Sequence, residues 1–102
     1  MEEGGPLNLI YTERSLKQLD DILDYLKPRN ERAAAKVFGR IQKTCERLTR
    51  HPFSGRPEGP RGSRTISVSR YPYVVMYRVH GGPPSEIEVL GVFHTSLGER
   101  KI

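Results

Sequence analysis

The chain has 102 residues, a formal net charge of +5 and an isoelectric point of about 9.7. Its length fits one domain with one modest core, and 35% apolar with 28% charged residues is typical of a folded, charge-rich domain rather than a disordered chain. No apolar run approaches the roughly 20 residues that span a bilayer, and the acidic, glycine-containing start lacks a signal-peptide pattern. We therefore expect a single domain over residues 1–102, with 1–6 and 97–102 flexible.

The single cysteine and the excess of arginine limit the cellular setting and the partners. Cys45 cannot form an intrachain disulfide and supplies no metal cluster, so we expect a reducing cytoplasm, no metal and no cofactor. Arginine outnumbers lysine, and its planar guanidinium suits phosphate and carboxylate groups. The basic surface predicts a polyanionic partner, either nucleic acid or an acidic protein, unless its charges are only solvated.

The first half predicts a strand and a helical hairpin. Residues 7–11 are compatible with a short strand, and Thr12 is a good N-cap for the helix that follows. The apolar stripe of this helix comprises Leu16, Leu19, Ile22, Leu23 and Leu26, and Pro28 ends it. Asn30 caps a second helix that ends at His51-Pro52. Its apolar stripe comprises Ala34, Val37, Phe38, Ile41, Cys45 and Leu48, while Lys36, Arg40, Lys43, Arg47 and Arg50 lie elsewhere on its surface.

A loop rich in proline and glycine, residues 52–63, leads into three strands between Arg64 and His94, the last two joined by the turn 81–85. In the middle strand Tyr73, Val75, Tyr77 and Val79 share one face, and Val74, Met76, Arg78 and His80 share the other. Simple alternation in the last strand places Ile87, Val89, Gly91 and Phe93 opposite Glu88, Leu90, Val92 and His94. The middle strand is apolar on one face and mostly apolar on the other, which favours a central position. We predict an α+β fold in βααβββ order, with the N-terminal strand and the helical hairpin packed on a mainly antiparallel sheet.

Candidate chemistry lies in the second half, where no standard catalytic or metal motif occurs. The candidate residues are Arg56, Arg61, Arg64, Arg70, Arg78, His80 and His94, with Tyr71, Tyr73 and Tyr77 nearby. Cleavage of RNA by 2′-hydroxyl attack needs an acid, a base and cations around the phosphate, which such residues can supply. Each also has a structural interpretation. Arg78 on a central strand needs a partner, which is a phosphate, an acidic residue of another protein, or an internal carboxylate such as Glu86 or Glu88.

Taken together, these features resemble the RelE/ParE superfamily of toxins from bacterial type II toxin–antitoxin systems. The resemblance covers about residues 7–96. It rests on the βααβββ order, the hairpin, the PFSGRP segment, Arg64, the pair Tyr73 and Tyr77, and a final strand ending in His94. It implies a RelE/ParE-like fold and an antitoxin whose C-terminal segment wraps the toxin in a hetero-oligomer. RelE-like members are ribosome-dependent endoribonucleases, whereas ParE-like members inhibit DNA gyrase.

Three features favour the ParE branch: the long hairpin, the Pro-X-X-Gly-Arg form of the loop, and the short stretch 95–102 after the last strand. That stretch has no room for the C-terminal helix or catalytic tyrosine of several RelE-like nucleases. ParE-like chains commonly carry an arginine shortly after the final histidine, and the nearest match here, Arg100, is displaced. We predict partner contacts at Arg56, Arg61, Arg64, Arg70, Tyr73, Tyr77, Arg78 and Arg100.

Three functional interpretations remain open from the sequence. The first is a toxin that inhibits gyrase by binding, without chemistry of its own. The second is a messenger-RNA endoribonuclease that works on the ribosome through Arg64, Arg78 and His94. The third is an inactive member that only binds its antitoxin.

Overall fold

The computed structural model describes residues 7–83 and 85–96. The N-terminal residues 1–6 and the segment 97–102, both predicted to be flexible, lie outside the described residues, and so does Arg100. The elements in chain order are β1 (Asn8–Tyr11), α1 (Glu13–Leu26), α2 (Glu31–Leu48), β2 (Arg56–Pro57), β3 (Arg64–Ser67), β4 (Tyr73–His80) and β5 (Glu86–His94). The predicted βααβββ order is therefore confirmed, with one short strand, β2, inside the segment predicted to be a loop.

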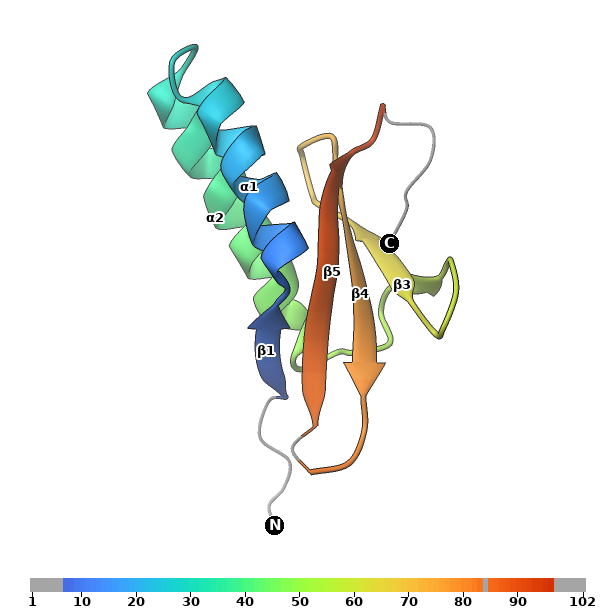
Figure 1. The fold of residues 1–102 in the computed structure, drawn as a ribbon. Helices are drawn as coiled ribbons and strands as arrows, with labels where there is room; N and C mark the ends of the chain where they lie inside the picture. The colour runs from blue at the N-terminus through green and yellow to red at the C-terminus, as the bar shows by residue number, and fades with distance from the viewer. Residues whose placement is uncertain (1–6, 84, 97–102) are drawn as a thin grey trace.

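The strands form one sheet in the order β1-β5-β4-β3-β2, and the helical hairpin lies along one of its faces (Figure 1). β1 pairs parallel to β5, and the other neighbours pair antiparallel. β4 occupies the centre of the sheet, as its two largely apolar faces predict. We call the face under the helices the helix face and the other one the open face.

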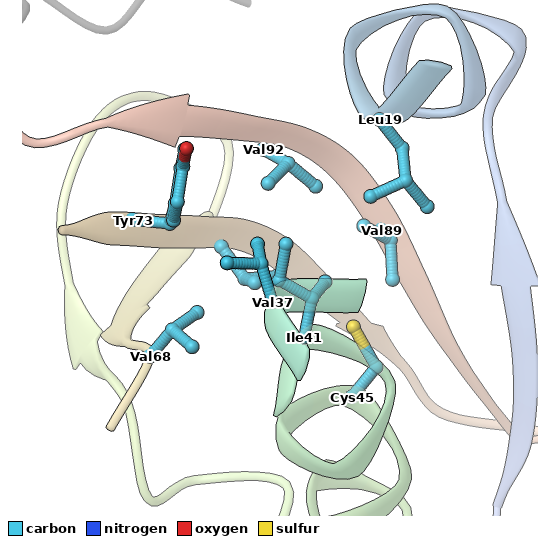
Figure 2. Close-up of a cluster of buried hydrophobic side chains, with 9 residues drawn as sticks. Leu19, Val37, Ile41, Cys45, Val68, Tyr73, Val89 and Val92 are labelled. Carbon is cyan, nitrogen blue, oxygen red and sulfur yellow. The ribbon is translucent and has the colours of Figure 1, made fainter. Parts of the chain in front are cut away.

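Both helices begin where the sequence predicts. The side chain of Thr12 accepts a hydrogen bond from the Ser15 amide, and that of Asn30 accepts one from the Ala33 amide. The helix-face core joins α1, α2 and the sheet (Figure 2). It comprises Leu19, Val37, Ile41, Cys45, Val68, Tyr73, Val75, Val89 and Val92. Leu16, predicted to belong to the apolar stripe of α1, is instead 48% exposed.

A register shift between Met76 and Tyr77 breaks the alternation of β5. Met76 pairs with Gly91 and Tyr77 pairs with Val89, so β5 has one additional residue, Leu90, at this point. Val92 consequently packs in the same helix-face core as Val89, three residues earlier, while Leu90 and Phe93 pack with Met76 in a cluster on the open face. The simple alternation predicted for this strand is thus correct up to Leu90 and wrong for Val92 and Phe93.

Polar contacts from the start of α1 hold the helix against β5. The backbone amide and side-chain hydroxyl of Thr12 both donate to the carbonyl of Val89, at 3.1 and 2.9 Å. Further along α1, the side-chain oxygen of Gln18 accepts from the Val92 amide at 2.9 Å. β1 pairs with β5 only as far as Val89, so Gln18 takes the place of a strand partner for the exposed edge beyond it.

Candidate functional site

A buried tyrosine of β4 fixes the PFSGRP segment through hydrogen bonds. The Tyr77 side chain is fully buried; its hydroxyl donates to the Pro52 carbonyl at 2.8 Å and accepts from the Gly55 amide at 2.9 Å. A Cβ on Gly55 would lie 2.6 Å from that hydroxyl and 2.7 Å from the Thr65 carbonyl oxygen, so only glycine fits. Burial raises the pKa of Tyr77, against the opposing effects of the Gly55 amide and Arg64. Tyr77, predicted to contact a partner, therefore has a structural function here.

Arg64 holds the same segment from strand β3, which lies between β4 and β2. Its guanidinium donates to the Gly55 carbonyl at 2.7 Å and lies 4.9 Å from the centre of the Phe53 ring. Phe53 is itself 65% exposed, so the arginine and the ring form an exposed pair beside the loop.

On the open face, Arg78 has an internal partner. Its guanidinium lies 3.5 Å from the carboxylate of Glu88, which is also 2.8 Å from Nε2 of His80. Nε of Arg78 donates to the carbonyl of Arg61 at 2.9 Å and so ties the 58–63 loop to the sheet. The sequence left open whether the partner of Arg78 is a phosphate, an acidic residue of another protein or an internal carboxylate, and the structure shows the internal carboxylate of Glu88. His80, grouped with the candidate catalytic residues, is the third member of this cluster.

His94 lies at the other end of the sheet, against Tyr73. The two rings meet edge to face with their centroids 5.3 Å apart. Nδ1 of His94 accepts a hydrogen bond from the Ser96 amide at 3.1 Å and lies 2.7 Å from the Ser96 hydroxyl. Tyr73 is buried, and burial raises its pKa, whereas His94 is exposed.

The three residues predicted for a nuclease site do not converge. Arg64 pairs across the strands with Tyr77, so it lies on the helix face, whereas Arg78 projects from the open face. His94 pairs with Tyr73, four residues along β4 from Tyr77, a strand distance of about 13 Å. Their catalytic assignment stays a prediction.

The other predicted contact residues are dispersed. Arg56 on β2 and Arg61 in the following loop are exposed, and Arg70 is exposed in the turn between β3 and β4. Arg61 and Arg70 both have positive φ, 59° and 76°, which is uncommon for residues other than glycine. Their assignment to a partner interface remains a prediction.

A row of cations on α2, to which the sequence alone assigned no function, is prominent in the structure. We define the basic stripe as Lys36, Arg40, Lys43, Arg47, Arg50 and Arg70. The first five recur at intervals of three or four residues, which places them on one side of α2 and its C-terminal turn. Arg70 joins them from the turn between β3 and β4. Their helical spacing was visible in the sequence; the contribution of Arg70 was not.

Two hollows of about 290 and 420 Å³ lie between the helices and share Phe38. Leu16 and Leu23 of α1 and Ala35 of α2 contribute further apolar surface. We call this surface the hairpin groove. It explains why an apolar residue such as Leu16 belongs to the helical stripe and yet is half exposed.

Within residues 7–83 and 85–96, no group of three or more His, Cys, Asp or Glu side chains is placed to hold a metal ion. Neither helix of that part of the chain has the length and apolar character needed to cross a membrane.

The architecture and its surfaces define the class of protein. A mixed sheet covered on one face by a helical hairpin is the fold of RelE/ParE-type toxins. The structure superposes on a chain of the chromosomal ParDE toxin–antitoxin system of P. aeruginosa with a TM-score of 0.74 and 26% identity, over 86% of this chain and 95% of that one. The family described as the ParE toxin of the type II toxin–antitoxin system parDE matches residues 9–96, and the chain belongs to this family.

Two further solved structures share the fold. A chain of the toxin–antitoxin complex RelBE2 from Mycobacterium tuberculosis has a TM-score of 0.61 and 20% identity, over 88% of this chain and 99% of that one. The YoeB/ParE toxin from Agrobacterium tumefaciens has a TM-score of 0.61 and 22% identity, over 86% and 98%. A Sinorhizobium fredii protein named "Putative toxin Y4kP" is 33% identical over 84 residues, 82% of this chain and 83% of the relative.

Proposed function

We propose that the chain is a toxin that inhibits DNA gyrase by binding and is neutralised by a cognate antitoxin in a hetero-oligomer. The observation that carries the proposal is the match of residues 9–96 to the ParE toxin family. The P. aeruginosa structure, described as a ParDE toxin–antitoxin system, supports an antitoxin partner. Gyrase is a cytoplasmic enzyme, so the proposal places the toxin in the cytoplasm.

The placement of the candidate nuclease residues supports binding rather than chemistry. A nuclease needs an acid, a base and cations within hydrogen-bond reach of one phosphate. Arg64 and Arg78 lie on opposite faces, and each donates to a backbone carbonyl of the loop that follows α2. These contacts favour a structural function for both arginines. A ribosome-dependent nuclease is the alternative that an expression experiment must exclude.

The antitoxin segment that best fits the hairpin groove is an amphipathic helix with an acidic polar face. The groove offers apolar contacts from both helices, as a helix-in-groove complex requires. The net charge of +5 attracts an acidic chain over a longer range than these apolar contacts act. We place the antitoxin here rather than on the open face, because the open face carries the polar cluster of Arg78, Glu88 and His80 at one of its ends.

Expression of the chain without its antitoxin tests the target. Gyrase inhibition predicts the DNA-damage response, filamentation and intact messenger RNA, together with loss of supercoiling by purified gyrase when the toxin is added. Rapid arrest of translation with transcripts cut in the ribosomal A site would instead establish the nuclease. Absence of any toxicity would favour an inactive member that only binds its antitoxin.

The variants Arg64→Ala and Arg78→Ala separate the two toxic mechanisms further. A nuclease that uses these cations loses transcript cleavage in either variant, whereas a gyrase inhibitor stays toxic as long as the protein folds. Circular dichroism of each purified variant provides the control, since both arginines also hold the loop that follows α2.

A further inference from the structure

The basic stripe is an accumulation of charge that no contact among the described residues explains. In the part of the chain that the structure describes, none of its six cations lies within ion-pair distance of a carboxylate. One acidic residue, Glu46, lies among them. Two cations outside the stripe do have such a partner: Lys17 pairs with Asp21, and Arg78 with Glu88. Unpaired like charges this close repel each other, so their concentration favours an anionic ligand.

From this concentration of cations without carboxylate partners we propose that the basic stripe binds the phosphate backbone of duplex DNA without reading its sequence. Lys36 to Arg47 span about 16 Å of α2 at 1.5 Å per residue, and Arg50 extends the row by a further turn. Along one DNA strand, about five phosphates occupy the same axial length. The row of cations is therefore long enough to face several successive phosphates of one strand.

The surroundings of the stripe favour nucleic acid over an acidic protein segment. Ser69, which lies beside the stripe, offers a hydroxyl of the kind that donates to phosphate oxygens. A protein interface needs apolar anchors at its centre. The one aromatic ring at the stripe, Tyr71, packs against the helix-face core instead. Single-stranded nucleic acid is also disfavoured, because it binds through exposed aromatic rings on which its bases stack.

Arg70 supplies a second observation. Its backbone has a φ of 76°, a conformation that strains a residue other than glycine. This turn nevertheless presents an exposed arginine beside Lys36, Arg40 and Lys43 of α2. A glycine would relieve the strain, so the presence of arginine at this position favours a binding function for the side chain.

The choice of DNA over RNA rests on the proposed function, because gyrase acts on duplex DNA.

Binding itself is tested without gyrase. The purified full chain is titrated into a fluorescent 20-base-pair DNA duplex, and anisotropy is followed at several salt concentrations. Six phosphate contacts predict a slope of log K against log salt of about −5. Two duplexes of unrelated sequence are expected to bind equally well.

The variant Arg40→Gln/Arg47→Gln should weaken binding by about tenfold or more at 0.1 M salt and flatten the slope by about 2. The matched control, Lys17→Gln/Lys27→Gln, removes the same charge from exposed positions of α1 or its end and should retain most of the affinity. Arg70→Gly should weaken binding without lowering the Tm, a combination that a structural function of Arg70 would not produce.

Equal losses in the two double variants would overturn the proposal, because they would show that net charge alone decides binding. Tighter binding of an RNA duplex of the same length, or of polyglutamate at equal charge, would assign the stripe to another partner and also overturn it. Loss of DNA binding with gyrase inhibition retained would contradict this inference alone. Retained DNA binding without gyrase inhibition would contradict only the proposed target.

Discussion

The hydroxyl of Tyr77 lies 2.9 Å from the amide of Gly55, 22 residues earlier in the chain, and 2.8 Å from the carbonyl of Pro52. One fully buried side chain of the central strand thereby fixes the loop that follows α2. The glycine of PFSGRP is explained by the same contact, because a Cβ at this position would collide with the tyrosine hydroxyl. The motif that suggested the family is therefore a structural connection between the helical hairpin and the sheet.

The first prediction concerns this hydroxyl. In Tyr77→Phe the buried Gly55 amide loses its acceptor, and unfolding free energy should fall by about 1–3 kcal/mol. Urea denaturation followed by circular dichroism measures it. The matched control is Tyr25→Phe. Because Tyr25 is 60% exposed, this variant should lose no more than about 0.5 kcal/mol of unfolding free energy. Equal effects in the two variants would contradict a structural function for the Tyr77 hydroxyl.

The second prediction compares two glycines under the same substitution. Gly55→Ala should destabilise by several kcal/mol or prevent folding, because its Cβ would meet the backbone oxygen of Thr65 at 2.7 Å. Gly39→Ala should stabilise by about 0.5–1 kcal/mol, since Gly39 lies within α2 and a Cβ there meets nothing within 4 Å. Thermal denaturation of both variants shows whether each substitution raises or lowers the stability. A stabilising Gly55→Ala would refute the proposed packing of the loop.

Periodicity predicted the helices, their caps and the central position of β4, because these features depend on local spacing and on burial of one strand. The register shift at Met76 and Tyr77 was missed, since the additional residue in β5 depends on pairing with another strand. β2 was missed because two residues containing a proline carry no strand pattern. The sequence could name Glu88 as a possible partner of Arg78 but could not choose it over Glu86, which the register places opposite His80.

The candidate site was harder to predict than the fold. Residue type suggested that Arg64, Arg78 and His94 act together, but the register places Arg78 on the face opposite Arg64, and His94 pairs with Tyr73, four residues along β4 from the partner of Arg64. The basic stripe on α2 shows the opposite case. Its spacing was visible, and its importance became clear only when the structure added Arg70 and showed that its charges have no internal partners among the described residues.

The third prediction is a loss of stability at alkaline pH. Burial raises the pKa of the Cys45 thiol from 9.0 to about 11, although a hydrogen bond with Tyr11 opposes the shift. Between these values the unfolded chain releases a proton that the native state retains, so stability falls as pH rises through this window. The thiol contributes about 2 kcal/mol to the fall between pH 7.5 and 10.5.

Urea denaturation at the two pH values measures the fall, and Cys45→Ala is the control. The variant should be less stable at pH 7.5, because it leaves a small cavity in the core, but should lose less stability on going to pH 10.5. Burial also raises the pKa of Tyr11, so part of the fall should persist in the variant. An equal fall in both proteins would show that Cys45 does not contribute.

The last prediction concerns the hairpin groove and rests on the proposed antitoxin. Leu16 is 48% exposed in the groove, and Ile10 is 41% exposed on β1, on the side of the sheet away from Leu9 and the core. Each change to glutamine removes a similar apolar surface and should alter stability by only about 0.5 kcal/mol. If the antitoxin helix docks between α1 and α2, Leu16→Gln should weaken the complex by about tenfold while Ile10→Gln leaves it intact. Calorimetric titration of each toxin variant with the cognate antitoxin measures the difference, and the reverse pattern would move the antitoxin to the open face.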